Sequence, residues 1–109
     1  MKFSFSKELE IAQMAEGLNR KIVNYCDNLM VCEVHFEREG VTAAMHSHPH
    51  EQCTYVVSGK LKATINDETH ILEKGDSMLM APNEPHALTA LEESVVVDTF
   101  TPMREDFIK

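Results

Sequence analysis

Cysteines are few in this sequence and do not occur in pairs. Cys26, Cys32 and Cys53 are odd in number, and no two of them form a CxxC motif. This spacing argues against a disulfide framework and against a cysteine zinc site. We therefore expect all three to be buried, reduced thiols.

Positive charge is also scarce. The chain has 10 lysines and arginines against 18 acidic residues, which gives a formal net charge of −8. Such a surface repels phosphate backbones, and no basic patch stands out, so nucleic acid is not an expected partner. An anionic small molecule would need a locally positive site, built from a metal ion or an arginine.

Long hydrophobic runs are missing. No segment approaches the roughly 18 apolar residues that cross a bilayer, and residues 1–6 lack the apolar stretch of a signal peptide. We expect no membrane partner and a cytoplasmic location. The 109 residues and 43% hydrophobic content are typical of one domain with one core.

From residue 18 onward the sequence consists of short runs rich in Val, Ile, Thr, Tyr and Phe, separated by Gly, Asn, Asp or Pro. The expected strands are 21–25, 29–36, 42–47, 52–58, 60–65, 69–72, 77–81, 87–91 and 95–100. No helix is needed between them, so the pairing should be antiparallel. The pattern predicts an all-β, single-domain jelly-roll barrel over 18–102, preceded by an arm or short helix at 1–17 and followed by a tail at 103–109.

Histidines cluster in the middle of the chain. His46 and His48 are two residues apart, so on a strand both side chains point into the barrel, and Gln52 has the same parity. His86 follows a proline-rich turn and can enter the same interior from a neighbouring strand. Three imidazoles and one neutral oxygen predict a single divalent metal ion, which could be nickel, zinc, manganese or iron.

The remaining histidines are poorer candidates for metal ligands. His35 and His70 are isolated, and we expect them on the surface or in hydrogen bonds. His50 follows Pro49, which bends the chain out of strand geometry, so we expect it behind the metal ligands or at the mouth of the site, and not as a ligand. Glu51 points away from the interior if its strand is regular.

Two segments resemble the motifs of the cupin superfamily. The first is Gly40, His46-Ser47-His48, Gln52 and Gly59, with glutamine where glutamate is usual, and the second is Gly75-Asp76 with Pro82-Asn83-Glu84-Pro85-His86. The resemblance implies the cupin form of the jelly roll, the double-stranded β-helix. Because Gln52 replaces a carboxylate, the metal centre is more positive by one unit, which favours an anionic substrate and Lewis-acid chemistry.

The last strand contains a single acid among apolar residues. Asp98 and Phe100 share one face, and if that face lines the interior, Asp98 is a candidate general acid or base and Phe100 a wall for a ring. Arg104, beyond Pro102, could then hold a carboxylate with two hydrogen bonds. The plainer alternative pairs Asp98 with a lysine, buries Phe100 in the core and leaves Arg104 in a solvated tail.

Segments 46–52 and 101–107 together resemble the KdgF-type cupins of pectin and alginate breakdown. That resemblance implies conversion of a 4,5-unsaturated monouronate into a linear ketonised sugar acid. It assigns metal binding to His46, His48, Gln52 and His86, the reactive acid to Asp98, and substrate contacts to Phe100 and Arg104.

Two other functions remain open from the sequence: an iron-dependent cupin dioxygenase, and a non-catalytic cupin that binds a sugar or a metal. A homodimer is also expected, because segments such as 55–57 and 95–97 are apolar on both faces of a strand, whereas a small barrel uses its interior for only one of them.

Overall fold

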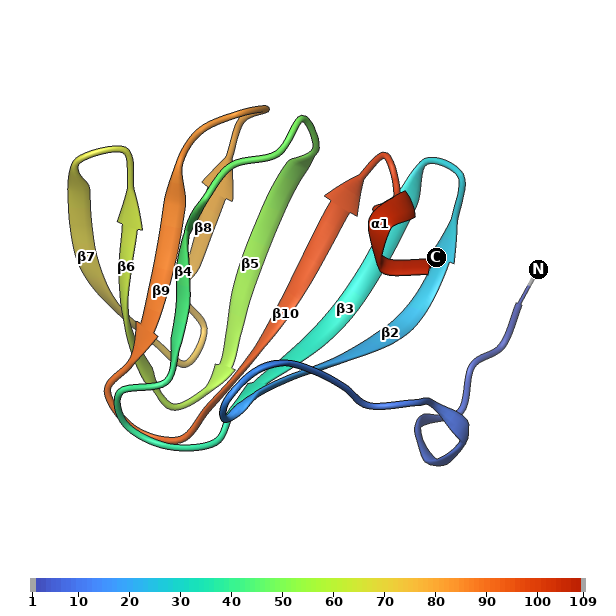
Figure 1. Cartoon of the computed structure of the whole chain (residues 1–109), viewed down its shortest axis with the longest axis horizontal. Coiled ribbons are helices and arrows are strands. Elements are labelled where there is room, and N and C mark those ends of the chain that lie inside the picture. The colour runs from blue at the N-terminus through green and yellow to red at the C-terminus, as the bar shows by residue number, and fades with distance from the viewer. Residues whose placement is uncertain (1, 109) are drawn as a thin grey trace.

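In the computed structural model, which describes residues 2–108, two antiparallel β-sheets face each other, as expected for a jelly roll (Figure 1). The elements are η1 (Ser6–Glu8), β1 (Ala12–Ala15), β2 (Leu18–Cys26), β3 (Leu29–Phe36), β4 (Thr42–His46), β5 (Glu51–Ser58), β6 (Lys60–Ile65), β7 (Glu68–Glu73), β8 (Ser77–Met80), β9 (His86–Ala90), β10 (Ser94–Thr101) and α1 (Glu105–Ile108). The all-β prediction is confirmed, and each expected strand overlaps one of β2 to β10. The short strand β1 and helix α1 were not anticipated.

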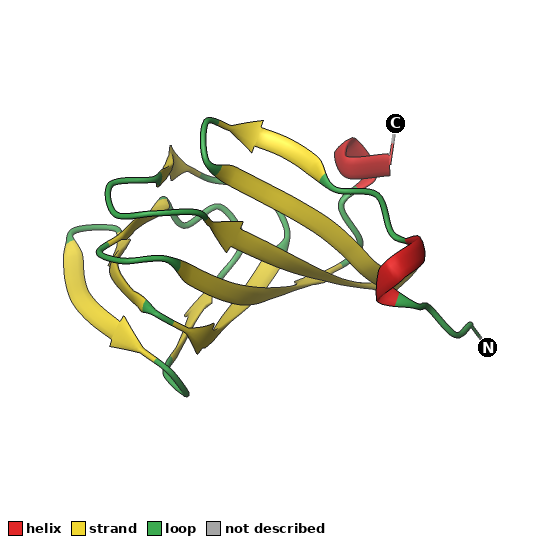
Figure 2. Cartoon of the chain, turned by 90° about the horizontal axis from the view of Figure 1, so that it is seen from below, coloured by secondary structure: helices red, strands yellow, loops and turns green. Residues whose placement is uncertain are grey.

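The larger sheet has the order β1-β2-β3-β10-β5-β8, and the smaller has the order β4-β9-β6-β7. Figure 2 shows the two layers from below, with the long strands of the larger sheet extending past the smaller one. Strands distant in sequence therefore become neighbours: β10 lies between β3 and β5, and β9 lies between β4 and β6. This topology brings the middle and the end of the chain to one interior.

Alternation of buried and exposed residues determines which side chains reach that interior. Along β5, the buried residues are Gln52, Thr54 and Val56, while the residues between them are exposed. The main core lies between the sheets. A smaller cluster of Met30, Cys32 and Phe100 lies beyond it, with α1 packed against it through Phe107. The site described below lies where these two clusters meet.

The expectation of three buried thiols is wrong for two of them. Cys32 is buried, but Cys26 and Cys53 are exposed, because Cys26 ends β2 at a turn and Cys53 lies on the outward face of β5. Burial raises the pKa of the Cys32 thiol to about 12, so that thiol stays protonated at neutral pH. Among residues 2–108, no helix has the length and apolar character needed to cross a membrane.

Candidate functional site

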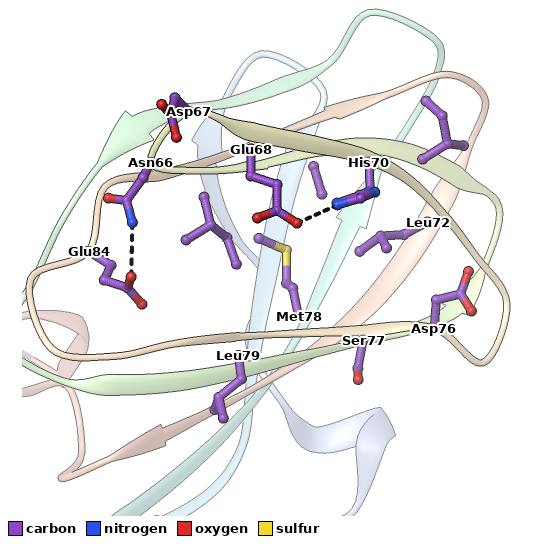
Figure 3. A pocket seen from close by; sticks show the side chains of 13 residues that line it. Asn66, Asp67, Glu68, His70, Leu72, Asp76, Ser77, Met78, Leu79 and Glu84 are labelled. Carbon is purple, nitrogen blue, oxygen red and sulfur yellow. Dashed lines mark hydrogen bonds and ion pairs between the residues drawn. The ribbon is translucent and has the colours of Figure 1, made fainter.

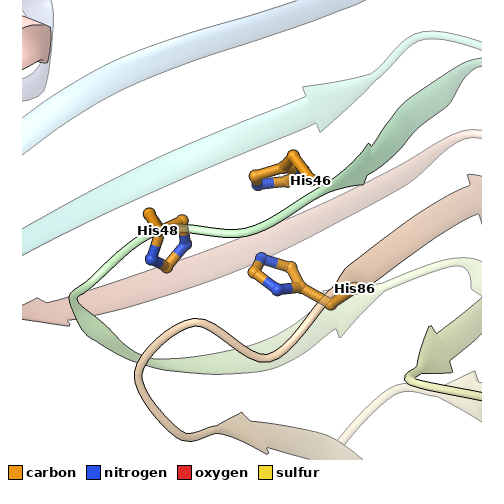
Figure 4. A group of neighbouring side chains, drawn as sticks. All are labelled: His46, His48 and His86. Carbon is orange, nitrogen blue, oxygen red and sulfur yellow. The ribbon is translucent and has the colours of Figure 1, made fainter.

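Three histidines converge inside one end of the barrel (Figure 4). His46 ends β4 and His86 begins β9, and the two are directly opposite each other in the sheet, with ring centroids 4.3 Å apart. His48 lies beyond β4, because the strand ends at His46 and not at residue 47 as expected. The parity argument therefore does not apply to His48, but the loop still brings its ring within 5.0 Å of the His86 ring.

The three rings are oriented by the backbone in the same way. Each Nδ1 donates a hydrogen bond to a carbonyl two residues away in the chain. These carbonyls belong to Ala44 (2.7 Å), His50 (3.1 Å) and Glu84 (2.8 Å). In a neutral imidazole that donates through Nδ1, Nε2 carries the lone pair, which is the form that binds a metal ion. One ring nitrogen of each histidine lies within 4.8 Å of those of the others.

Nε2 of His86 is the strongest sign that the cluster suits a cation. This atom is buried, and within the described part of the chain it has no hydrogen-bond partner. A buried lone pair without a partner is unfavourable, and a bound metal ion would satisfy it. Burial also lowers the pKa of His48 and of His86, which favours the neutral, metal-binding form of both rings.

Gln52 completes the donor set. Its Oε1 lies 2.8 Å from Nε2 of His48, although both atoms are acceptors when His48 donates through Nδ1. Rotating the amide would not help, because Nε2 of Gln52 donates to Oγ1 of Thr54 (3.0 Å), whose proton is already donated to Asp98. Two acceptors facing each other are stabilised by a cation. Three imidazoles and one amide oxygen therefore fit a divalent metal ion.

Asp98 is joined to this cluster through Thr54. The two residues are opposite each other on β10 and β5, and the Thr54 hydroxyl donates to Oδ1 of Asp98 at 2.6 Å. Burial raises the pKa of Asp98, while hydrogen bonds from Thr54 and Gln52 oppose that rise. The partner of Asp98 is therefore a hydroxyl and not a lysine. An acid whose pKa is raised beside a cation site is suited to proton transfer.

Phe100 and Arg104 lie on the same side of the site. Phe100 is 2% exposed and packs edge-on against the rings of His48 and Phe107, at centroid distances of 5.8 and 5.7 Å. The Arg104 side chain is only 12% exposed, so it does not lie in a solvated tail. Its two-pronged hydrogen bond goes to Asp106, at 3.1 and 2.8 Å.

A cavity of about 60 Å³ connects these groups. Its lining includes His46, Gln52, His86, Asp98, Phe100, Arg104 and Phe107. Since one water takes about 30 Å³ in the liquid, the cavity has room for about two waters. The structure thus brings six of the seven sequence-predicted site residues to one small cavity. The seventh, His48, stands beside it in contact with Gln52.

Sequence reasoning missed Thr54 and Phe107. The signal for Thr54 was present, because it has the same parity as Gln52 on β5, but hydroxyl side chains are common in strands. The other histidines lie where we expected them. His35 bonds to Glu93 and His70 to Glu68 at the surface, while His50 lies behind His48 and accepts its Nδ1 hydrogen bond.

A larger hollow of about 650 Å³ opens between β7 and β8, where the two sheets are not paired (Figure 3). Acidic side chains such as Glu68 and Glu84 line it, and their hydrogen bonds go to His70 and Asn66. It contains none of the predicted site residues. We therefore place the chemistry in the smaller, more enclosed cavity beside the histidines.

Known proteins resemble this chain along most of its length. Residues 32–100 match the cupin domain family Cupin_2. The chain is 40% identical over 98 residues to the pectin degradation protein KdgF of Dickeya dadantii (strain 3937), covering 88% of each sequence. It superposes on KdgF from Halomonas sp. with a TM-score of 0.92 and 31% identity, covering 98% of both chains. An RmlC-like cupin from Shewanella frigidimarina NCIMB 400 gives a TM-score of 0.93 at 32% identity, covering 98% of this chain and 96% of that one.

Proposed function

The chain belongs to the cupin family, and from that premise we propose that it is a metal-dependent enzyme acting on 4,5-unsaturated monouronates, the products of pectin and alginate lyases. The reaction would yield a linear, ketonised sugar acid. The observation that carries the proposal is the hydrogen-bonded chain from Gln52 through Thr54 to Asp98, which links a buried acid to the amide oxygen that faces His48 in the histidine cluster. The similarity to KdgF agrees with this assignment.

In this proposal His46, His48, Gln52 and His86 hold one divalent metal ion. When bound, the ion supplies positive charge that polarises substrate oxygens. The four ligands are neutral, so an anionic substrate is favoured. The carbonyls of Ala44, His50 and Glu84 hold the imidazoles in the required tautomer.

Asp98 moves the proton. Its carboxylate takes the proton from the anomeric hydroxyl, the C1–O5 bond breaks as the C1 carbonyl forms, and C4 receives the proton as C5 becomes a ketone. Atoms and electrons balance without an oxidant. Because burial raises the pKa of Asp98, its carboxyl holds a proton more readily than an exposed aspartate does, which suits a group that accepts a proton and returns it.

Arg104 and Phe100 would position the substrate. Arg104 releases Asp106 and binds the uronate carboxylate in its place. Its present two-pronged hydrogen bond to the Asp106 carboxylate has the geometry that a substrate carboxylate would need. Phe100 forms an apolar wall beside His48. Together they would place the reacting carbons next to Asp98.

A direct assay tests this function. The protein is purified with its native metal, mixed with 4,5-unsaturated galacturonate monomer, and the loss of alkene ultraviolet absorbance is followed beside a chelator-treated sample. We expect metal-dependent loss far above the spontaneous rate. If metal-loaded protein does not accelerate the loss, the proposal fails. Oxygen consumption with Fe(II) would then indicate a dioxygenase, and ligand binding without turnover would indicate a binding protein.

A further inference from the structure

A second arginine, Arg20, approaches the site from β2. It lies between Leu18 and Ile22 on the inward face of that strand. Its Nε is buried, and in residues 2–108 it finds no hydrogen-bond partner. Over the same residues, no carboxylate lies within ion-pair distance of its guanidinium. A partly buried positive charge without an acid is unfavourable and would be stabilised by an anion.

Arg20 and Arg104 meet at one aromatic ring. Their guanidinium carbons lie 3.8 and 4.3 Å from the centroid of Phe107. Both positive charges also oppose the rise in the pKa of Cys32, so both act electrostatically on the same buried thiol. Cys32 pairs with Asp98 across β3 and β10, which places this thiol next to the candidate acid. Two like charges that share one aromatic ring repel each other, and an anion bound by both would offset that repulsion.

The two arginines differ in what they already bind. Arg104 is engaged by both carboxylate oxygens of Asp106, whereas the guanidinium of Arg20 lies over the Phe107 ring and its buried Nε has no hydrogen-bond partner among residues 2–108. In a chain with a net charge of −8, an arginine available to an anion beside the metal site stands out.

We propose that Arg20 binds the substrate carboxylate together with Arg104, and that Phe107 covers this anion site. The proposal rests on the function assigned above and deepens it. A cavity of about 60 Å³ is too small for a six-carbon sugar acid, and in this proposal α1 shifts when the substrate enters, because Phe107 on α1 lines the cavity. Displacing Phe107 uncovers both guanidinium groups, and the carboxylate replaces their contact with the ring.

The test replaces Arg20 by methionine, which keeps an unbranched apolar stem and removes the guanidinium with its charge, its hydrogen-bond donors and its contact with the Phe107 ring. Lys21→Met is the matched control, because it removes one positive charge from the next residue of β2, which faces Glu33 instead. The measurements are kcat and KM for unsaturated galacturonate, and the Kd values of galacturonate and of neutral galactose. For Arg20→Met we expect KM and the galacturonate Kd to rise about 10- to 100-fold, with kcat within about threefold and the galactose Kd unchanged.

Each alternative outcome is decisive. If Arg20→Met matches Lys21→Met within about twofold, or weakens galacturonate and galactose equally, Arg20 does not bind the carboxylate. If the wild-type protein fails to bind galacturonate, the carboxylate site is also overturned. If the wild-type protein lacks turnover but its galacturonate binding depends on Arg20, the anion site stands and the proposed reaction does not.

Discussion

Two aspartates near the site have opposite electrostatic environments. Burial raises the pKa of Asp98, whereas the hydrogen bonds from Arg104 lower the pKa of Asp106. For Asp98 the folded state binds its proton more tightly than the unfolded chain. The stability from this proton is therefore fully present below the ordinary pKa of 3.8 and is lost as the pH rises through the folded-state value. For Asp106 the pH dependence is the opposite: the stability from its charged form is present above the ordinary pKa of 3.8 and is lost as the pH falls through the folded-state value.

Asp98→Asn should separate catalysis from stability. Since Thr54 can donate to the new amide oxygen, we expect the variant to fold and to bind metal while turnover falls about 100-fold or more. The metal-free variant should melt at a higher temperature than the wild type at pH 7, and this gain should disappear near pH 4. Thermal melts at both pH values and the absorbance assay measure these effects.

Asp106→Asn is the control for the stability effect and should lower the melting temperature at pH 7. Full turnover in Asp98→Asn would remove Asp98 from proton transfer.

The turn between β8 and β9 holds the histidine cluster together. Asn83 adopts a left-handed φ of 66°, and its N–H donates to the carbonyl of His48 at 2.7 Å. The next residue, Glu84, accepts from Nδ1 of His86 through its carbonyl. One turn therefore fixes the loop that carries His48 and the ring that begins β9. Asparagine tolerates this conformation better than other non-glycine residues.

Changes at Asn83 test the role of this turn. Asn83→Ala should lower the free energy of unfolding by about 1 kcal/mol and weaken metal affinity, because alanine disfavours a left-handed backbone. Asn83→Gly, the control, should keep both properties close to the wild type. Chemical denaturation and metal titration compare the variants. Equal values for alanine and glycine would mean that the backbone conformation of this turn does not control the site.

The outer face of the larger sheet is apolar where β5 and β8 pair. Tyr55 is 47% exposed and Leu79 is 67% exposed, and Val57 and Cys53 extend the same surface. Apolar patches of this kind often mark interfaces between protein chains. The homodimer predicted from the sequence would use this face, with a second copy as its partner.

Leu79→Glu tests the dimer. We expect light scattering to give the mass of a dimer for the wild type and of a monomer for the variant, because two-fold symmetry places each introduced charge at the interface twice. Ile71→Glu, at an exposed position on β7 in the other sheet, should leave the dimer intact. A wild-type protein with a monomer mass would rule out this interface.

The sequence by itself determined the strands and the group of candidate ligands. Alternation with a period of two and closely spaced turn residues are local signals, so they predicted the nine strands from β2 to β10. The resemblance to cupins rested on the two sequence motifs around His46 and His86. Spacing along the chain also indicated which histidines could share a site. The argument from spacing required the strand to extend through residue 47, however, whereas β4 ends at His46.

Only the tertiary structure decided which residues meet. The opposition of His46 and His86, the link from Gln52 through Thr54 to Asp98, and the approach of Arg20 and Arg104 to Phe107 all join segments distant in sequence. Periodicity tells which face a side chain occupies, but the register between strands decides its neighbour. That register comes from packing the whole chain, and therefore no local pattern contains it.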